Sequence, residues 1–167
     1  MITRRDILLG TAGVAAVAAA GIGLLKWQGS EATAATEGRF EVTKTPEEWR
    51  KILTPEQYAV LREEGTERAW SSPLNKEKRE GVFACAGCDL ALFESETKFE
   101  SGTGWPSFYA TIEGAVEKSQ DWSFGMLRDE VHCRRCGGHL GHVFNDGPQP
   151  TGLRYCMNGA AMKFIPA

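Results

Sequence analysis

The chain has 167 residues, of which 42% are hydrophobic and 25% are charged. This length suits one ordinary domain and excludes two independent cores, and the composition excludes both a disordered chain and a multi-span membrane protein. A formal net charge of -3 provides no basic surface for nucleic acid, so we expect no nucleic-acid partner. The five cysteines are an odd number, so any pairing among them leaves one thiol over.

The first 34 residues have the pattern of an export signal. A positively charged start precedes a long apolar stretch, and the small residues 32–34 offer a cleavage site. Residues 3–8 hold two adjacent arginines and resemble a twin-arginine signal, which implies export of an already folded protein to the periplasm or the outer face of the cytoplasmic membrane. Two alternatives to a cleaved signal stay open: residues 7–25 are long enough to remain as a membrane anchor, or they form a buried helix of the domain.

The rest of the chain is expected to form a linker over residues 35–44 and one domain over residues 45–167. Two short helices are predicted first, over residues 46–52 and 55–64. Each begins with a threonine N-cap, a proline at the first helical position and a Glu or Gln that completes a capping box. Gly65 is the expected stop of the second helix.

Beyond Gly65 the pattern changes to short aromatic and β-branched stretches separated by Gly, Pro, Asn and Asp. No long helical period occurs between residues 81 and 167, so this part is predicted to form short antiparallel strands. The fold class is therefore expected to be mainly β, with short helices at the N-terminal side.

Four of the cysteines form two C-x-x-C pairs, which are Cys85 with Cys88 and Cys133 with Cys136. This spacing lets one tight turn direct two thiolates at one ion, and two such turns complete a closed, structural four-sulfur zinc site. Such a metal would staple two distant segments of a small domain. Disulfides are the alternative, because an exported protein meets an oxidising environment.

The fifth cysteine, Cys156, is either a small buried hydrophobic side chain or a nucleophile. Arg154 lies two positions away and shares its side of a strand if this segment is one, where its charge would favour a thiolate. His139 and His142 lie in a glycine-flanked segment that we expect to be a loop rather than a helix. A thiolate beside imidazoles can combine nucleophilic attack with proton transfer. As an alternative, the two histidines could join two thiolates around zinc, which would leave three cysteines unassigned.

Trp105 stands between Gly104 and Pro106, which hold it in a rigid turn. Such a residue either lines a pocket or packs as a core aromatic under a loop, and composition alone does not separate the two.

Taken together, four motifs closely resemble those of the B-type peptide-methionine (R)-S-oxide reductases. They are Cys85-Ala-Gly-Cys88, Ser101-Gly-Thr-Gly-Trp-Pro-Ser-Phe108, the run from Cys133-Arg-Arg-Cys136 through His139, His142, Phe144 and Asp146, and Arg154-Tyr-Cys156-Met-Asn158. The resemblance covers roughly residues 44–165, with the motifs in the family's order and spacing. It implies a β-tent, a fold of two small antiparallel sheets, and repair of one epimer of oxidised methionine.

The resemblance also implies roles for individual residues. Cys156 would attack the sulfoxide sulfur, and release of methionine would leave Cys156 as a sulfenic acid, while His139 and His142 would bind and protonate the sulfoxide oxygen. Arg154 would help to stabilise the thiolate. The four C-x-x-C sulfurs match the zinc ligands of the zinc-containing members, which implies one structural Zn²⁺.

Four further residues take substrate-binding roles by the same resemblance. Trp105 and Phe144 would form an apolar wall for the methyl group of the substrate, and Asn158 and Asp146 would be supporting polar groups. The implied partners are oxidised methionine in proteins or peptides and an external thiol reductant, and a monomer is expected.

The chain departs from many relatives at one position. Thr103 stands where those relatives have a resolving cysteine, which closes a disulfide with the nucleophile. We therefore expect a thioredoxin-like protein or a small thiol to reduce the sulfenic acid directly; the rival is transient use of a zinc-site cysteine. Functions of other classes that remain are a zinc-stabilised binding module without catalysis and a zinc hydrolase that uses the two histidines.

Overall fold

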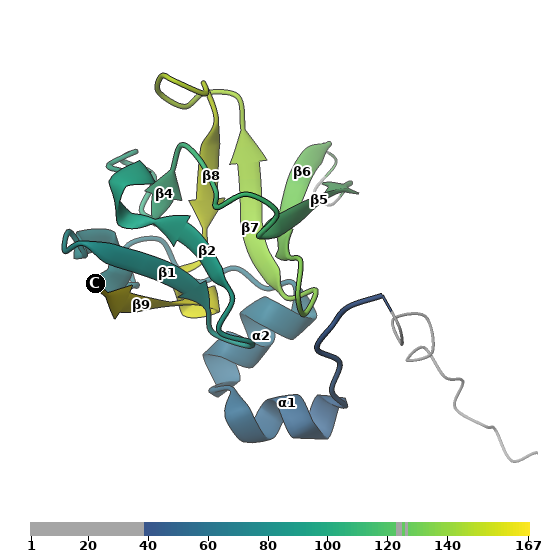
Figure 1. Cartoon of the computed structure of the whole chain (residues 1–167). Helices are drawn as coiled ribbons and strands as arrows, with labels where there is room; N and C mark the ends of the chain where they lie inside the picture. The colour runs from purple at the N-terminus through teal and green to yellow at the C-terminus, as the bar shows by residue number, and fades with distance from the viewer. Residues whose placement is uncertain (1–38, 123–124, 126) are drawn as a thin grey trace, which may run out of the picture. The chain divides into compact units, whose positions relative to one another are not determined.

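The computed structural model describes residues 39–122, 125 and 127–167 (Figure 1). The predicted export signal and the first part of the predicted linker lie outside the described residues. Among the residues described, no helix combines the length and the apolar content that crossing a membrane requires.

Two short helices open the described domain as the capping motifs predict: α1 spans Pro46–Ile52 and α2 spans Pro55–Glu63. The hydroxyl of Thr45 accepts from the Glu48 N–H at 3.3 Å, and the Glu48 carboxylate accepts from the Thr45 N–H at 2.8 Å. Thr54 and Gln57 repeat this reciprocal arrangement at the start of α2. Each box satisfies two backbone donors that a helix start leaves without partners.

The second helix ends differently from the prediction. Glu64, rather than Gly65, adopts the left-handed conformation, with φ 55°. Gly65 is needed for a different reason, because its N–H donates to the carbonyl of Ala59 at 2.9 Å and a side chain there would press on that carbonyl.

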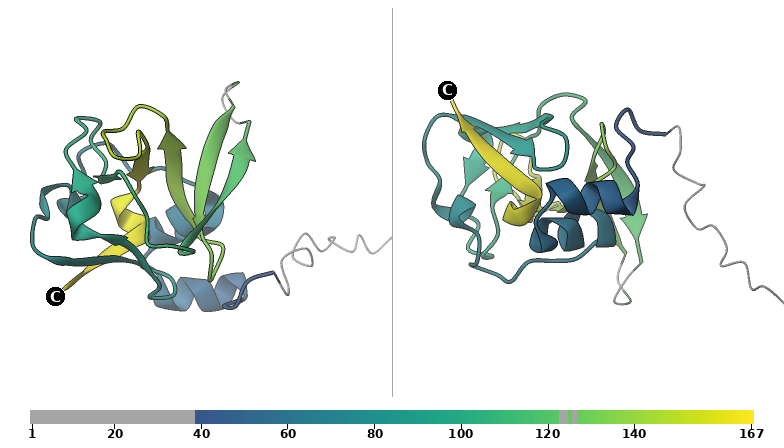
Figure 2. Two further views of the ribbon diagram at one scale, coloured as in Figure 1. Left: turned by 45° about the horizontal axis from the view of Figure 1, so that its top comes forward. Right: turned by 90° about the horizontal axis from the view of Figure 1, so that it is seen from below.

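The described residues after these helices form two sheets, in which every strand pair is antiparallel, as predicted. The three-stranded sheet has the order β2-β1-β9, and the six-stranded sheet has the order β3-β4-β8-β7-β6-β5. Figure 2 shows the β5–β6 hairpin beside β7 at one edge of the larger sheet. The strands are β1 Gly81–Cys85, β2 Ala91–Glu94, β3 Lys98–Phe99, β4 Ser107–Phe108, β5 Val116–Asp121, β6 Arg128–Cys133, β7 His139–Phe144, β8 Arg154–Met157 and β9 Met162–Pro166; short 3₁₀ turns span Pro73–Lys76, Ser95–Thr97 and Gly159–Ala161.

Buried aromatic rings join the two sheets. Phe83 of β1 and Phe93 of β2 come from the smaller sheet, and Phe108 of β4 comes from the larger one; all three are fully buried. The rings of Phe93 and Phe108 stack with centroids 4.3 Å apart, and Phe83 meets Phe108 edge-on at 4.9 Å. Aromatic pairs of this kind add about 0.5–1.5 kcal/mol beyond the area that they bury. This cluster fixes the position of β4 and, through it, of its neighbour β8.

The larger sheet has one polar face, and the strand register assembles it. Cys156 of β8 pairs with His142 of β7, which pairs with Glu130 of β6, which in turn pairs with Ser119 of β5. Side chains paired across strands lie on the same face of a sheet. Four neighbouring strands therefore place a thiol, an imidazole, a carboxylate and a hydroxyl in one row.

Candidate active site and metal centre

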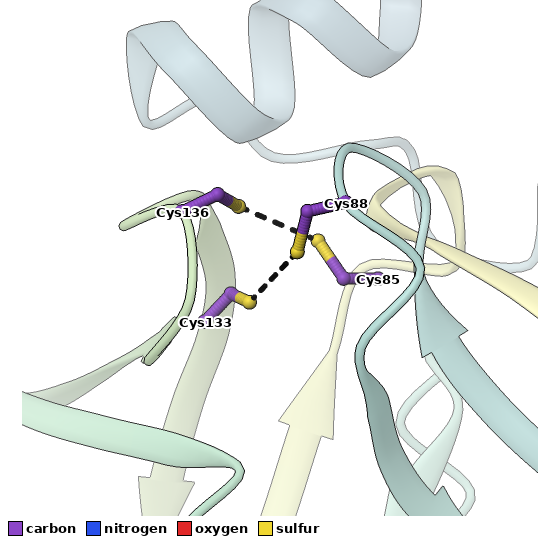
Figure 3. A group of neighbouring side chains, drawn as sticks. All are labelled: Cys85, Cys88, Cys133 and Cys136. Carbon is purple, nitrogen blue, oxygen red and sulfur yellow. Dashed lines mark hydrogen bonds between the residues drawn. The ribbon is translucent and has the colours of Figure 1, made fainter. Parts of the chain in front are cut away.

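The four C-x-x-C cysteines converge although they come from opposite sheets. Cys85 ends β1 of the smaller sheet, Cys133 ends β6 of the larger one, and their partners Cys88 and Cys136 lie in the turns that follow. Figure 3 shows the four sulfurs directed at a common centre, two from each turn, and all lie within 4.8 Å of one another. The sulfur of Cys85 is 3.7 Å from that of Cys136, and the sulfur of Cys88 is 3.5 Å from that of Cys133.

These separations fit four ligands around zinc. A Zn–S bond of about 2.3 Å with tetrahedral angles places neighbouring sulfurs about 3.8 Å apart, whereas a disulfide requires about 2.05 Å. All five cysteines belong to the described part of the chain and none is in a disulfide. Among the described residues the cysteines form this group without a histidine, so the histidine-containing zinc site is not supported. The donor set and its geometry suit one closed, structural Zn²⁺, which ties the two sheets together.

The N-terminal helices cover both cysteine turns. Gly87 faces Trp49 and Leu61, and a side chain at Gly138 would press on Leu61. Arg62 of α2 donates to the carbonyl of Cys136 at 2.9 Å. The missing side chain at Gly138 thus lets α2 pack closely on the second cysteine turn, while a Cβ at Gly87 would lie at ordinary contact distance from both helices.

Cys156 lies near the centre of the larger sheet, between β4 and β7. It pairs with Ser107 on one side and with His142 on the other, and its side chain is partly buried. Arg154 shares its face of β8, as the spacing predicted, while Tyr155 between them is buried in the core. The neighbouring strands therefore fix the nucleophile candidate on both sides.

A β-bulge brings His139 and His142 to one face. Residues three apart in a regular strand point to opposite faces, but the register of β6 and β7 shifts, so that Val131 pairs with Gly141 and His132 with His139. The two site rings consequently lie 5.5 Å apart between centroids. The predicted loop over this segment was wrong, because the segment is strand β7 with one extra residue.

Gly141 misled the prediction for a structural reason. It has φ 154°, and a Cβ there would overlap the carbonyl of Cys156 and approach Cα of Met157 to 3.0 Å. The glycine therefore marks a close approach of β7 to β8 instead of a loop.

His142 is held by an acidic partner from the edge of the sheet. Its Nε2 lies 2.8 Å from a carboxylate oxygen of Asp121, and the same oxygen accepts from Arg128 at 2.6 Å. Burial lowers the pKa of His142, which its hydrogen bond to Asp121 opposes. Burial thus favours the neutral imidazole, held in a fixed orientation.

His139 is paired with Glu130 in the same manner. Its Nδ1 lies 2.7 Å from Glu130, whose other oxygen accepts from Ser119 at 2.6 Å. The hydrogen bond with His139 is the largest influence on Glu130 and lowers the pKa of this carboxyl group to about 2. A carboxylate only accepts, so Nδ1 carries the hydrogen, and the buried Nε2 has no hydrogen-bond partner among the described residues. That nitrogen is available to an incoming oxygen atom.

The Glu130–His139 contact predicts a pH-dependent contribution to stability. A carboxylate whose pKa is lowered by folding stabilises the protein above its unfolded pKa, and this stabilisation disappears as the pH falls through the folded value. Glu130→Gln is expected to lower the free energy of unfolding by about 1–2 kcal/mol at pH 7. The difference from wild type should shrink between pH 4.5 and about 2, as urea unfolding at several pH values would measure.

Glu117→Gln is the matched control for this measurement. Glu117 contacts His132 at 3.3 Å from the same strand as Ser119, but its side chain is 42% exposed. Water screens such a pair, so its loss should change stability little. A Glu130→Gln defect of the same size at pH 7 and pH 2.5 would contradict the interpretation of the Glu130 contact.

Arg154 is fixed by two contacts. Its guanidinium donates twice to Asp146, each bond 2.8 Å long, and lies 4.4 Å above the ring of Phe144. The carboxylate of Asp146 raises the pKa of Arg154, to which the nearby Cys156 adds, and Arg154 lowers the pKa of Asp146. One face of the sheet thus carries Arg154, Phe144 and Cys156, and Asp146 binds the guanidinium group of the arginine.

The side chains of Trp105 and Asn158 form hydrogen bonds with backbone groups of Glu67 and Leu140. The indole N–H of Trp105 donates to the carbonyl of Glu67 at 3.1 Å. The Asn158 side chain is buried, where it accepts from the Glu67 N–H at 3.0 Å and donates to the carbonyl of Leu140 at 3.2 Å. The structure therefore places Asn158 among backbone groups, where it supports β7 and the segment after β8.

Sequence reasoning missed the acidic partners of the site. Glu130, Asp121 and Ser119 were not predicted, because polar residues follow one another without alternation in β5 and in the first half of β6, so the sequence does not show which of them share a face. Glu67 was missed as well; its buried carboxylate accepts from the N–H groups of Gly159 at 2.6 Å and Ala160 at 2.8 Å. Burial is the main influence on Glu67 and raises its pKa.

Comparison with known proteins places this arrangement in a family. A match to the SelR domain covers residues 53–166. The chain is 57% identical over 126 residues to a peptide methionine sulfoxide reductase MsrB of Leptospira interrogans, covering 75% of this chain and 96% of the relative. The MsrB of Pseudomonas putida is 57% identical, covering 75% of this chain and 96% of the relative, and that of Methanosarcina barkeri is 58% identical, covering 74% and 87%. The chain therefore belongs to the SelR family, together with these MsrB proteins.

Proposed function

We propose that this protein is an enzyme that reduces methionine (R)-sulfoxide in proteins and peptides back to methionine, with Cys156 as the nucleophile. The observation that carries the proposal is the pairing of Cys156 with His142 on one face of the sheet, with Arg154 two residues away on the same face. A thiol, a guanidinium group and an imidazole thus lie on one face of the sheet, which supports this role for Cys156. Membership of the SelR family supports the reaction class, and the motifs shared with the B-type enzymes support the R epimer.

The reaction requires an acid as well as a thiolate. A sulfoxide sulfur becomes electrophilic when its oxygen is protonated or strongly hydrogen-bonded, so the two groups must converge. The thiolate of Cys156 forms a bond to the substrate sulfur while the oxygen takes a proton from Nε2 of His139 in its imidazolium form, whose Nδ1–H stays bonded to Glu130 and whose Nε2 is left as the neutral acceptor. The oxygen then passes to Cys156, so methionine leaves reduced by two electrons and Cys156 becomes a sulfenic acid, oxidised by two.

Phe144 and Trp105 are proposed to bind the methyl group of the substrate, with Asp146 and Asn158 in support. Phe144 lies on the same strand and face as His142, because it pairs with Arg154 where His142 pairs with Cys156. Trp105 lies two residues from Thr103, which contacts the sulfur of Cys156 at 3.7 Å. Asp146 acts through Arg154, and Asn158 through the backbone that it binds.

Cys156 is proposed to be regenerated by two external thiols, from a thioredoxin-like protein or a small thiol. The first attacks the sulfenic acid, releases water and forms a mixed disulfide; the second displaces Cys156 and leaves as part of an external disulfide. Thr103 supports this route, because its hydroxyl occupies the position against Cys156 where an internal resolving thiol would act. The four remaining thiols face one another in the metal cluster.

A stereochemically resolved assay tests the proposed function. Peptides that carry either the R or the S sulfoxide are incubated with purified protein and dithiothreitol, and methionine is measured by chromatography. Consumption of the R epimer alone is expected, and no consumption of either would refute the proposal. Mass spectrometry after one turnover without reductant should find Cys156 as a sulfenic acid, trapped by dimedone; an internal Cys156 disulfide would refute the external route.

We also propose that the protein is exported by the twin-arginine route and acts as a monomer in the periplasm or at the outer face of the cytoplasmic membrane. The arginine pair and the apolar stretch within the first 34 residues support the route. Sequencing the N-terminus of the exported protein decides whether the signal is removed near Ala34 or retained.

A further inference from the structure

Three hydroxyl side chains form a hydrogen-bonded row that ends at Cys156. The Oγ1 of Thr103 lies 3.7 Å from the sulfur, Ser101 Oγ lies 2.8 Å from Thr103 Oγ1, and Ser107 Oγ lies 2.7 Å from Ser101 Oγ. At its far end, Ser107 donates to the carbonyl of Trp105 at 3.1 Å. The mechanism proposed above does not use this hydroxyl row, which consists of Thr103, Ser101 and Ser107.

The far end of the hydroxyl row fixes the direction of every hydrogen in it. Each hydroxyl has a single hydrogen to donate, and a carbonyl oxygen only accepts. Ser107 gives its hydrogen to Trp105, so it accepts from Ser101; Ser101 has then used its own hydrogen and accepts from Thr103. Thr103 is left with an oxygen lone pair facing Cys156.

This direction suits a thiol better than a thiolate. The S–H of Cys156 can donate to the lone pair of Thr103, whereas a negatively charged sulfur would meet an oxygen that offers no hydrogen. For Thr103 to donate to the thiolate while both hydrogen bonds within the row are kept, all three hydroxyls must turn and Ser107 must leave the carbonyl of Trp105. The bond between Ser107 and Trp105 therefore opposes ionisation of a residue that it does not touch.

We infer that Thr103, Ser101 and Ser107 form a reversible hydrogen-bond chain, which accepts from the thiol of Cys156 and, once reversed, donates to its thiolate. Thr103 touches the reacting sulfur, while Ser101 and Ser107 are positioning residues that act through it. This inference rests on the proposed function, since it concerns the nucleophile of that reaction. The hydrogen bond from Ser107 to the carbonyl of Trp105 therefore influences how readily Cys156 becomes reactive.

Charged groups also act on Cys156 and must be held constant. His142 and His139 face it from β7, with Asp121, Arg128 and Glu130 behind them, and Arg154 faces it from β8, with Asp146 behind. A test that alters only the hydroxyl row leaves these groups in place. Differences between such variants therefore report on the row itself.

The test measures how fast iodoacetamide alkylates Cys156 at pH 6, with mass spectrometry of the peptide that contains it. Ser107→Ala removes the hydrogen bond to the carbonyl of Trp105, so Thr103 becomes free to donate to the thiolate. One hydrogen bond gained by the charged form should raise the thiolate fraction about tenfold, and because a stabilised thiolate is a weaker nucleophile, alkylation should become about threefold faster. Ser101→Ala should have the same effect without changing a residue of β4.

A second background separates the hydrogen-bond chain from simple disturbance of the sheet. In a Thr103→Val protein, Ser107→Ala should no longer change the rate, because the hydroxyl that transmits its effect is absent. In a Thr103→Ser protein, which keeps the hydroxyl, the acceleration should return. The inference would be overturned if neither Ser107→Ala nor Ser101→Ala accelerates alkylation. It would also be overturned if Ser107→Ala still accelerates alkylation in the Thr103→Val protein.

The outcome is independent of the test of function. The alkylation assay contains no sulfoxide, so a protein inactive on both epimers could still show the predicted pattern. Conversely, an enzyme active on the R epimer whose alkylation rates ignore Ser107 would retain its function and refute the hydrogen-bond chain.

Discussion

Replacing Cys156 with serine is expected to lower the rate of methionine sulfoxide reduction by at least about a thousandfold. The reaction moves two electrons from the Cys156 sulfur to the substrate sulfur, and a serine hydroxyl cannot be oxidised in this way. Its oxygen is also a much poorer nucleophile at neutral pH than a thiolate. The rate with an R-sulfoxide peptide and dithiothreitol would be compared between the two proteins.

The fold should be unaffected by this change. Cys156 is partly buried, its sulfur contacts the hydroxyl of Thr103, and serine fits the same strand position between β4 and β7. The thermal midpoint and the zinc content should therefore match wild type. Equal rates in the two proteins would refute Cys156 as the nucleophile and would favour a zinc-stabilised module without this chemistry.

Loss of the metal centre is expected to have the largest effect on stability. Cys133→Ser removes one of four ligands from a site that joins the two sheets, and the metal's binding energy is part of the folding energy. We expect a loss of more than about 3 kcal/mol in the free energy of unfolding and a fall of about 10 °C or more in the thermal midpoint. Metal analysis and thermal unfolding would measure both.

Cys156→Ser serves as the matched control, since it is the same substitution at a cysteine outside the metal cluster. Cys133→Ser should lose zinc and stability, whereas Cys156→Ser should lose activity alone. Zinc near zero in the wild-type protein, with the four thiols oxidised, would overturn the metal site. A chelator that leaves the thermal midpoint of wild type unchanged would do so as well.

Local sequence signals predicted the parts of the molecule that depend on local physics. The capping boxes at Thr45 and Thr54 fix both helix starts within four residues of chain, and C-x-x-C spacing needs only one tight turn. The separation of Arg154 from Cys156 required only that β8 be a strand. Each of these predictions could be made without knowing where any distant segment lies.

The features that sequence reasoning missed depend on distant segments. Gly141 favoured a loop by composition, and only the approach of β8 explains why a glycine stands within β7. Glu130 and Asp121 became functional candidates once strand pairing placed them beside His139 and His142. The chain of hydroxyls needs the register of β4 against β8, which no local pattern encodes.

The pairing of β1 with β9 has a consequence for folding order. Val82 pairs with Ile165, so β1, the first strand that the structure describes, completes its sheet with β9, the last one described. Contacts between such distant residues form slowly, because a long loop must close before they add stability. The three-stranded sheet can therefore be completed only after β9 has left the ribosome, so the domain folds as a unit after that point.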